Sequence, residues 1–271
     1  MLVLGRLYRR GVPGVGWLLA EGLWLALFGA AFAVWLFPSE ASLVAVFLVA
    51  IASVDSLERL LVENRRRIYE DGERPLRANL HICALLLALF AGTTVGFSLL
   101  GLFLPLDLVE LLFAKQLEGY GANFPGLQFG GAAPLLKANL FVLFFFFVIA
   151  LFFRQGGVML AVAWNAGVWG ATCGWLARTW DGGPPLVEAW FRVAGTCLPH
   201  LALEAAAFVL AGLAGVFLSK GLLRHALDSE PVRSIATSAA ALLAVAVGLV
   251  VLGAFWEALV APHLHLWLIS G

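Results

Sequence analysis

Residues 135–153 read LLKANLFVLFFFFVIALFF, an apolar run in which Lys137 is the only charged residue. A bilayer core about 30 Å thick requires roughly 20 apolar residues in a helix, so this run predicts a membrane-spanning helix. The whole chain has the same character, because 62% of its 271 residues are hydrophobic and only 13% are charged. This composition excludes a soluble globular enzyme and a disordered protein.

The charge balance excludes a further class of function. The 17 Lys and Arg residues are matched by 17 Asp and Glu residues. No basic excess is left to hold a phosphate backbone, so we expect no nucleic-acid partner. The expected location is the cell (inner) membrane, which the chain crosses several times.

Apolar runs of similar length recur along the chain. We predict an all-α integral membrane protein with about seven transmembrane helices and one interfacial amphipathic helix. The predicted spans cover residues 14–37, 41–61, 79–104, 135–153, 156–177, 198–218 and 234–260. They group into an N-terminal membrane region (1–133), a core of three spans (134–225) and a C-terminal span with its tail (226–271).

The distribution of Lys and Arg predicts the orientation. With the N-terminus in the cytoplasm and the C-terminus outside, the inner segments hold 13 of these residues and the outer segments hold 4. This is the bias expected of cytoplasmic loops. If residues 41–61 did not span, every later loop would change sides and the bias would be lost.

The two longest predicted loops differ in kind. Residues 57–77 place apolar side chains at helical spacing among charges, and they include Arg65, Arg66 and Arg67. They predict a cytoplasmic helix that either touches anionic lipid or docks a cytoplasmic partner. Residues 105–120 form an amphipathic pattern in which Val109, Leu112 and others would face lipid. The Gly- and Pro-rich remainder, up to residue 133, predicts a loop or a re-entrant segment.

The string LPHLALE at residues 198–204 carries the main candidate for a functional site. Proline is well placed in a first helical turn, so the string predicts a helix start. His200 and Glu204, four residues apart, then share one helix face. The functional readings are a proton relay, a metal site or a partner-binding patch. The structural reading is a hydrogen bond that fixes the helix against its neighbours.

Two asparagines extend this candidate. Asn139 and Asn165 lie in predicted spans, where a buried amide requires hydrogen-bond partners. We predict a polar seam of Asn139, Asn165, His200 and Glu204 between three neighbouring spans. Small residues allow close helix approach on the same spans. The predicted packing glycines are Gly167, Gly170, Gly174, Gly212 and Gly215.

Two short motifs occur in the same order in both halves of the chain, and we call this repetition the internal echo. Residues 76–80 read LRANL and residues 136–140 read LKANL, and each string opens a long apolar span. Each is followed by L-P-x-x-x-x-E, at residues 104–110 and 198–204. A duplication of the kind found in transporters and a chance match in apolar sequence both account for this pattern.

No pattern predicts a metal, a cofactor or a catalytic centre. Cys83, Cys173 and Cys197 lie singly in apolar runs, which favours small buried side chains. His263 and His265 have no acidic residue or cysteine after them. Nucleophile-elbow and nucleotide-binding motifs are absent from the sequence.

The polar positions between residues 139 and 215 resemble the stage II sporulation protein M (SpoIIM) family of membrane proteins. That family has an Asn opening a long apolar helix, then an Asn- and Gly-rich helix, then a P-H-G-x-x-E-like motif followed by A-G. The matching positions here are Asn139, residues 165–170 (NAGVWG), residues 199–204 (PHLALE) and residues 211–212 (AG). The resemblance covers about residues 134–225, a third of the chain. Ala166 and Leu201 depart from the family pattern, which has Gly at these places.

The resemblance implies a membrane-embedded assembly component. In sporulating bacteria the family looks like a scaffold for peptidoglycan-degrading partners, but relatives occur in organisms that never sporulate. His200 and Glu204 are carried over as motif positions without an assigned role. We therefore expect a non-enzymatic scaffold or assembly subunit of a cell-envelope complex. Its expected partners are membrane lipids, other membrane or envelope proteins, or a second copy in a homo-oligomer.

The alternative is a permease-like subunit that moves a lipid or small solute with a cytoplasmic ATPase. The echo, the polar seam and the charged inner helix favour it. An intramembrane hydrolase around His200 and Glu204 lacks a nucleophile.

Overall fold

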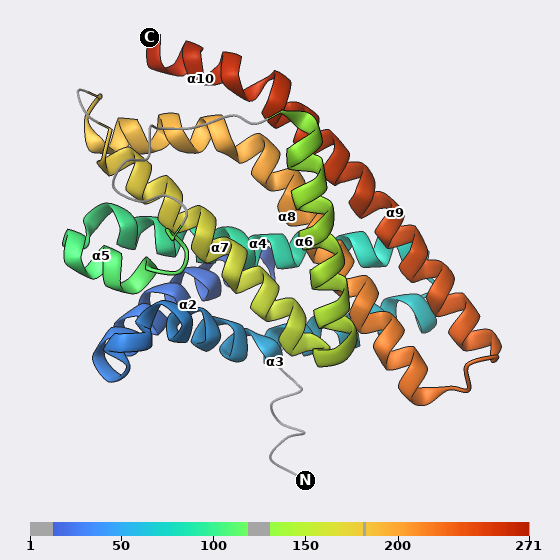
Figure 1. Ribbon diagram of the computed structural model, residues 1–271. Coiled ribbons are helices and arrows are strands. Elements are labelled where there is room, and N and C mark those ends of the chain that lie inside the picture. The colour runs from blue at the N-terminus through green and yellow to red at the C-terminus, as the bar shows by residue number, and fades with distance from the viewer. Residues whose placement is uncertain (1–12, 119–130, 181–182, 271) are drawn as a thin grey trace.

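The computed structural model of the protein describes residues 13–118, 131–180 and 183–270, and within these residues it is helical and contains no strand (Figure 1). The N-terminal helices are α2 (Val15–Leu36), the short 3-10 helix η1 (Pro38–Glu40), α3 (Ala41–Tyr69), α4 (Pro75–Phe103) and α5 (Leu106–Phe113). The remaining helices are α6 (Ala132–Phe153), α7 (Gln155–Arg178), α8 (Leu186–Arg224), α9 (Glu230–Leu259) and α10 (Ala261–Ser270).

Six of the described helices are long and apolar enough to cross a membrane: α2, α3 with η1, α4, α6, α8 and α9. The fold is therefore that of a helical membrane protein. The remaining predicted span, residues 156–177, corresponds to α7, which is not among the six. Its glycines and Asn165 lower its mean hydropathy, and more than half of its residues are buried against neighbouring helices. A helix enclosed by protein does not need the apolar surface that lipid requires.

The centre of the molecule is built by close backbone contact between α2, α4 and α7. A Cβ added at Gly170 on α7 would lie 2.5 Å from the carbonyl oxygen of Thr94 on α4. One added at Gly174 would lie 2.6 Å from that of Ser98. Only glycine permits such an approach. A single cluster of buried side chains, from Leu18 to Val250, joins the three regions expected from the sequence.

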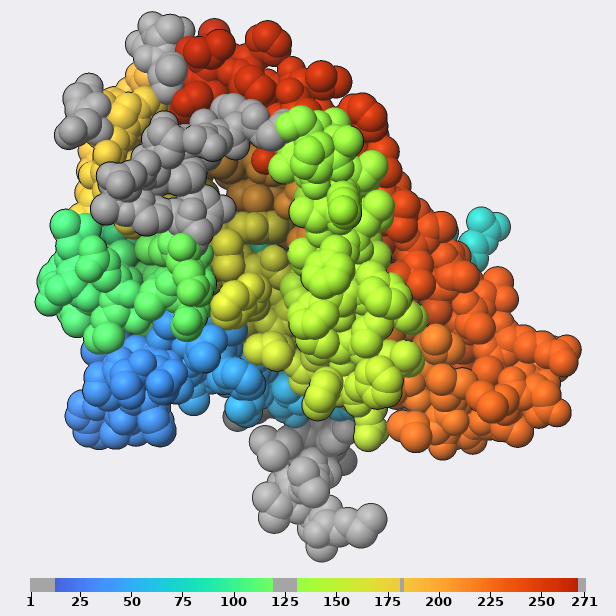
Figure 2. Space-filling view, viewed as in Figure 1, coloured from blue at the N-terminus to red at the C-terminus, as the bar shows by residue number. Residues whose placement is uncertain are grey.

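Helix α6 lies at the periphery, where it covers much of one face of the molecule (Figure 2). Its phenylalanines Phe141, Phe144, Phe152 and Phe153 are largely exposed, as expected for side chains that face lipid. Only Arg154, with a φ of 53°, separates α6 from α7. A non-glycine residue in this region of backbone space is uncommon, so the reversal between the two helices is tight and strained.

The structure corrects the predicted helix start at Pro199. Helix α8 begins at Leu186 and runs without interruption to Arg224, with Pro199 inside it. Proline removes one backbone hydrogen bond and crowds the preceding turn, so it bends a helix. Figure 1 shows α8 changing direction along its length. Its first part is anchored to α4, where the indole of Trp190 donates to Ser98 Oγ at 2.6 Å.

The structure also corrects the predicted lipid-facing helix in residues 105–120. Val109, Leu112 and Phe113 of α5 are buried in the protein. The ring of Phe113 packs edge-on against Phe97 of α4, with centroids 5.8 Å apart. The amphipathic pattern predicts a helix with one apolar face. Because lipid and a protein interior are equally apolar, the pattern does not show which of them that face contacts. Residues 119–130, which hold the end of this pattern and most of the predicted loop or re-entrant segment, lie outside the described residues.

Two helix turns meet at one end of the molecule. The predicted cytoplasmic helix is the second half of α3, which ends at Tyr69, and Gly72 with a φ of 69° lies in the turn to α4. The turn from α8 to α9 lies at the same end, because His225 and Pro231 line the same cavity as Tyr69 and Pro75. Helices α5 and α10 lie away from this end (Figure 1).

Candidate functional site

The predicted polar seam forms in part. Asn139 on α6 donates its Nδ2 hydrogen to the Oε1 of Glu204 on α8. Glu204 is only 5% exposed. The amide therefore satisfies a carboxyl group that would otherwise be costly to bury in a membrane. The contact also connects two helices that are far apart in sequence.

His200 on α8 and Glu257 on α9 lie near this contact. We call Asn139, His200, Glu204 and Glu257 the polar cluster. His200 lies one turn before Glu204 and is 7% exposed. Gly253 packs directly over both, since a Cβ there would lie 3.5 Å from Glu204 Cγ and 3.8 Å from the carbonyl oxygen of His200. The carboxyl group of Glu257 interacts electrostatically with Glu204. His200 Nδ1 and Trp256 Nε1 are buried without a hydrogen-bond partner among the described residues.

The chemistry of the polar cluster is that of acid–base groups rather than of a metal centre. It holds one imidazole, two carboxyl groups and one amide. Among the described residues, no group of three or more His, Cys, Asp or Glu side chains is arranged to hold a metal ion. Its acid–base groups lie on helices α8 and α9.

Asn165 is not part of the polar cluster. Its side chain donates back to the carbonyl oxygen of Ala161 at 2.8 Å on its own helix. It lines a small void of about 10 Å³ together with Phe90 and Phe208. A void of this size holds at most about one water molecule. The amide is thus satisfied locally, and the seam does not continue into α7.

The five predicted packing glycines differ in how closely neighbouring atoms approach them. A Cβ at Gly170 or Gly215 would lie 2.5 Å from a backbone carbonyl oxygen, of Thr94 or Phe147 respectively. At Gly212 the nearest atoms are side-chain carbons of Val158 at 3.2 Å. At Gly167 they lie at ordinary van der Waals distance, 3.5 Å and beyond. Gly170, Gly174 and Gly215 are therefore the predicted positions where backbone contact requires glycine.

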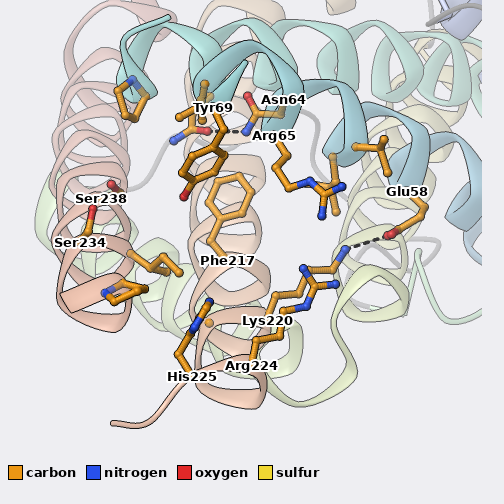
Figure 3. Close-up of a pocket in the computed structure, with 18 residues that line it drawn as sticks. Glu58, Asn64, Arg65, Tyr69, Phe217, Lys220, Arg224, His225, Ser234 and Ser238 are labelled. Carbon is orange, nitrogen blue, oxygen red and sulfur yellow. Dashed lines mark hydrogen bonds and ion pairs between the residues drawn. The ribbon is translucent and has the colours of Figure 1, made fainter. Parts of the chain in front are cut away.

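A second polar region lies at the end where the α3–α4 and α8–α9 turns meet. A cavity of about 650 Å³ opens there between these four helices (Figure 3). Lys220 Nζ donates to Glu58 Oε2 at 2.9 Å on one side of it. Asn64 Nδ2 donates to Asn79 Oδ1 at 2.7 Å on another. Figure 3 shows Arg65, Lys220 and Arg224 with their charged groups in the same part of the cavity.

The three predicted docking arginines point to different places. Arg65 lines the cavity. Arg66 forms ion pairs with Glu63 at 2.7 Å and with Asp71 at 3.0 Å, and Arg67 pairs with Glu73 at 3.0 Å. Consecutive residues of a helix diverge around its axis. The basic run therefore divides between the turn to α4 and the cavity.

Sequence reasoning missed several polar residues of this end. It did not select Asn64, Lys220, Arg224 or His225, because none lies in a recognisable motif. The only signal was Asn79 in the internal echo. Both asparagines of the echo do bond to a neighbouring helix, Asn79 to Asn64 and Asn139 to Glu204. A half-buried carboxylate was also missed in α2, where Glu21 accepts a hydrogen bond from Ser56 at 2.5 Å.

The remaining candidates from the sequence are the three cysteines and two histidines near the C-terminal end. The three cysteines are buried and do not form disulfides. His263 is exposed, whereas the ring of His265 lies beside Trp180, with centroids 6.4 Å apart. Burial lowers the pKa of His265 below its ordinary value. Both histidines are outside any metal-holding group of the described residues.

Comparison of the chain with family models, with curated proteins and with solved structures finds no match. The resemblance to the stage II sporulation protein M family therefore stays a prediction. It depends on the polar positions quoted above.

Proposed function

We propose that the protein is a non-enzymatic polytopic membrane scaffold or assembly subunit of a cell-envelope complex. The observation that carries the proposal is the glycine-mediated backbone contact between α4 and α7, at Gly170 and Gly174. Such contact holds the centre of the molecule dry and fixed. A rigid body of this kind suits a protein that positions partners.

The location of empty space supports the same proposal. A transporter of the usual type binds its substrate in a polar cavity near the bilayer midplane. The larger of the two described cavities lies at the helix ends, and the one beside Asn165 measures only about 10 Å³. The polar cluster around Glu204 is enclosed by α6, α8 and α9. Its groups therefore contribute to helix association.

We further propose seven crossings, with the N-terminus in the cytoplasm and the C-terminus outside. The α3–α4 and α8–α9 turns share one end, so an even number of crossings must separate them. Helices α4, α6, α7 and α8 supply that number only if α7 crosses as well. With 24 residues, α7 is about 36 Å long, which is sufficient. The bias of Lys and Arg supports the orientation.

The test is quantitative co-purification of the full chain from its native membrane in mild detergent. We expect envelope or membrane proteins, or a second copy of the chain, at constant stoichiometry. Arg66→Gln combined with Arg67→Gln tests docking at the α3–α4 turn, with Arg233→Gln on α9 as the matched control. Recovery of the chain as a monomer without such partners would contradict the proposal.

The alternative function is a permease-like subunit for a lipid or small solute, with a cytoplasmic ATPase as partner. The observation that favours it is the pair of buried ionisable residues His200 and Glu204 on α8, with the half-buried Glu257 on α9. Proteoliposomes that contain the purified chain and its co-purified partner distinguish the two functions. ATP-dependent flux that is lost in Glu204→Gln, while thermal stability is kept, would favour the permease.

A further inference from the structure

The cavity between the α3–α4 and α8–α9 turns has the size and position of a ligand site. Its volume of about 650 Å³ lies within the range of small-molecule sites. It is located where α3 and α8 end and where α4 and α9 begin. The ends of membrane-spanning helices lie near the boundary between hydrocarbon and water. A ligand at this place can be reached from the lipid headgroup layer.

The charged side chains of the cavity favour an anion. Arg65, Lys220 and Arg224 line it, and Glu58 is the carboxylate among its lining residues. Glu58 is already engaged by Lys220 at 2.9 Å and by Gln155. Among the described residues, Arg65 and Arg224 have no carboxylate partner. Two helices begin and two end here, so their dipoles offset one another. The charge of the side chains therefore decides whether the cavity favours an anion or a cation.

Hydroxyl-bearing side chains lie across from the cations. Figure 3 shows the phenol of Tyr69 directed toward Ser234 and Ser238 of α9, on the side away from Arg65 and Arg224. The cavity therefore has a cationic side and a neutral hydrogen-bonding side. A ligand that fills both sides carries a negative charge at one end and hydroxyl groups at the other.

The apolar part of the wall separates a lipid from a soluble anion. Leu61, Ile68, Phe217 and Ile235 line the cavity together with the polar groups. Apolar surface of this extent is not required to bind a free phosphate or a sugar phosphate. It suits the glycerol backbone and the first carbons of acyl chains.

We propose that this cavity binds an anionic phospholipid whose head group carries hydroxyl groups. The phosphate lies between Arg65, Lys220 and Arg224, because guanidinium and ammonium groups bind phosphate through charge-assisted hydrogen bonds. The head-group hydroxyls lie on the opposite side of the cavity, toward Tyr69, Ser234 and Ser238. The acyl chains leave past Phe217 and Ile235. This binding site is independent of the proposed scaffold function.

The experiment uses the full chain purified in a mild detergent and short-chain phosphatidylglycerol as the probe. Native mass spectrometry and the thermal unfolding midpoint report binding. We expect one retained lipid and a raised midpoint. Phosphatidic acid, which lacks the head-group hydroxyls, should bind more weakly, and phosphatidylcholine should leave the midpoint unchanged. Glycerophosphoglycerol and inorganic phosphate, the water-soluble parts of the ligand, should not reproduce the effect.

Matched variants separate the cavity from general surface charge. Arg65→Gln combined with Arg224→Gln removes two exposed cations and should weaken binding by about tenfold or more. Arg77→Gln combined with Arg233→Gln makes the same charge change outside the cavity and should bind normally. Ser238→Ala should reduce the preference for phosphatidylglycerol over phosphatidic acid.

Three results would overturn the proposal. The first is an equal loss of binding in both arginine pairs, which would indicate non-specific attraction. The second is an equal shift with phosphatidylcholine, which would indicate a detergent-like effect. The third is full binding of inorganic phosphate or glycerophosphoglycerol, which would show that the acyl chains are not recognised.

Discussion

The contact between α4 and α7 and the cavity between the α3–α4 and α8–α9 turns show two opposite ways of packing helices in a membrane protein. At the first, Gly170 and Gly174 bring the backbones together so closely that no side chain fits between them. At the second, the two turns enclose an open cavity, and charged side chains such as Lys220 and Arg224 line it. The comparison indicates that the centre of the molecule is built for fixed association and the end for binding.

The largest expected effect breaks the close contact itself. Gly170→Leu should lower the free energy of unfolding by about 3 kcal/mol, because its Cβ would meet the Thr94 carbonyl oxygen and overpacking strains a fixed backbone. Size-exclusion chromatography of solubilised protein and its thermal midpoint measure the loss. Gly248→Leu on α9 is the control, since nothing lies within 4 Å of a Cβ there. Equal stability of both variants would refute the close contact.

The next effect concerns the polar cluster at the edge of the dry centre. Glu204→Ala should cost about 2 kcal/mol, because it removes the acceptor of the Asn139 amide within the membrane. Glu204→Gln keeps a carbonyl acceptor and should cost less. Folded yield and thermal midpoint report both. A variant Glu204→Ala of unchanged stability would show that the cluster does not hold the helices together.

A smaller effect is expected at the open end. Lys220 and Glu58 are 22% and 36% exposed, so water screens their ion pair in part. A double-mutant cycle of Lys220→Met and Glu58→Gln should give a coupling energy of at most about 1 kcal/mol that decreases with salt. Chemical or thermal unfolding at two salt concentrations measures it. A large, salt-independent coupling would place this end in a dry interior like that at Gly170.

The smallest effect distinguishes two glycines of the same helix. Gly167→Ala should stabilise the protein by about 0.5 kcal/mol, because alanine loses less backbone entropy and its Cβ would meet Val46 at an ordinary 3.5 Å. Gly170→Ala should destabilise it. Thermal midpoints of the two single variants test this difference in sign. Destabilisation at both positions would mean that α7 is enclosed more tightly than the structure indicates.

The membrane-helix class was predictable from apolar runs, but the direction of each helix face was not. In water, an apolar stripe marks the buried side of a helix. In lipid both sides are apolar, so residues 135–153 predicted α6 without indicating that Phe141 and Phe144 face outward. For the same reason Val109 and Leu112 were expected to face lipid and are buried in protein. The low mean hydropathy of α7 goes with its burial among other helices. No pattern within its own residues predicts that burial.

The candidate site was predictable where partners lie on one helix and less so across helices. The spacing of His200 and Glu204 showed that they share a face, and their joint burial follows. Pro199 predicts a helix start, but α8 continues through it. The residues around a proline do not distinguish the first turn of a helix from the interior of a bent helix. The open end was missed because Glu58 and Lys220 are 162 residues apart in sequence.

The single residue that connects α6 to α7 has a mechanical consequence. Arg154 leaves no spare length between α6, whose phenylalanines are exposed, and α7, whose glycines pack directly on the backbone of α4. A change in bilayer thickness or tension that tilts α6 must then pull on α7 directly. We expect lengthening this link with flexible residues to uncouple the buried helix from the physical state of the surrounding lipid.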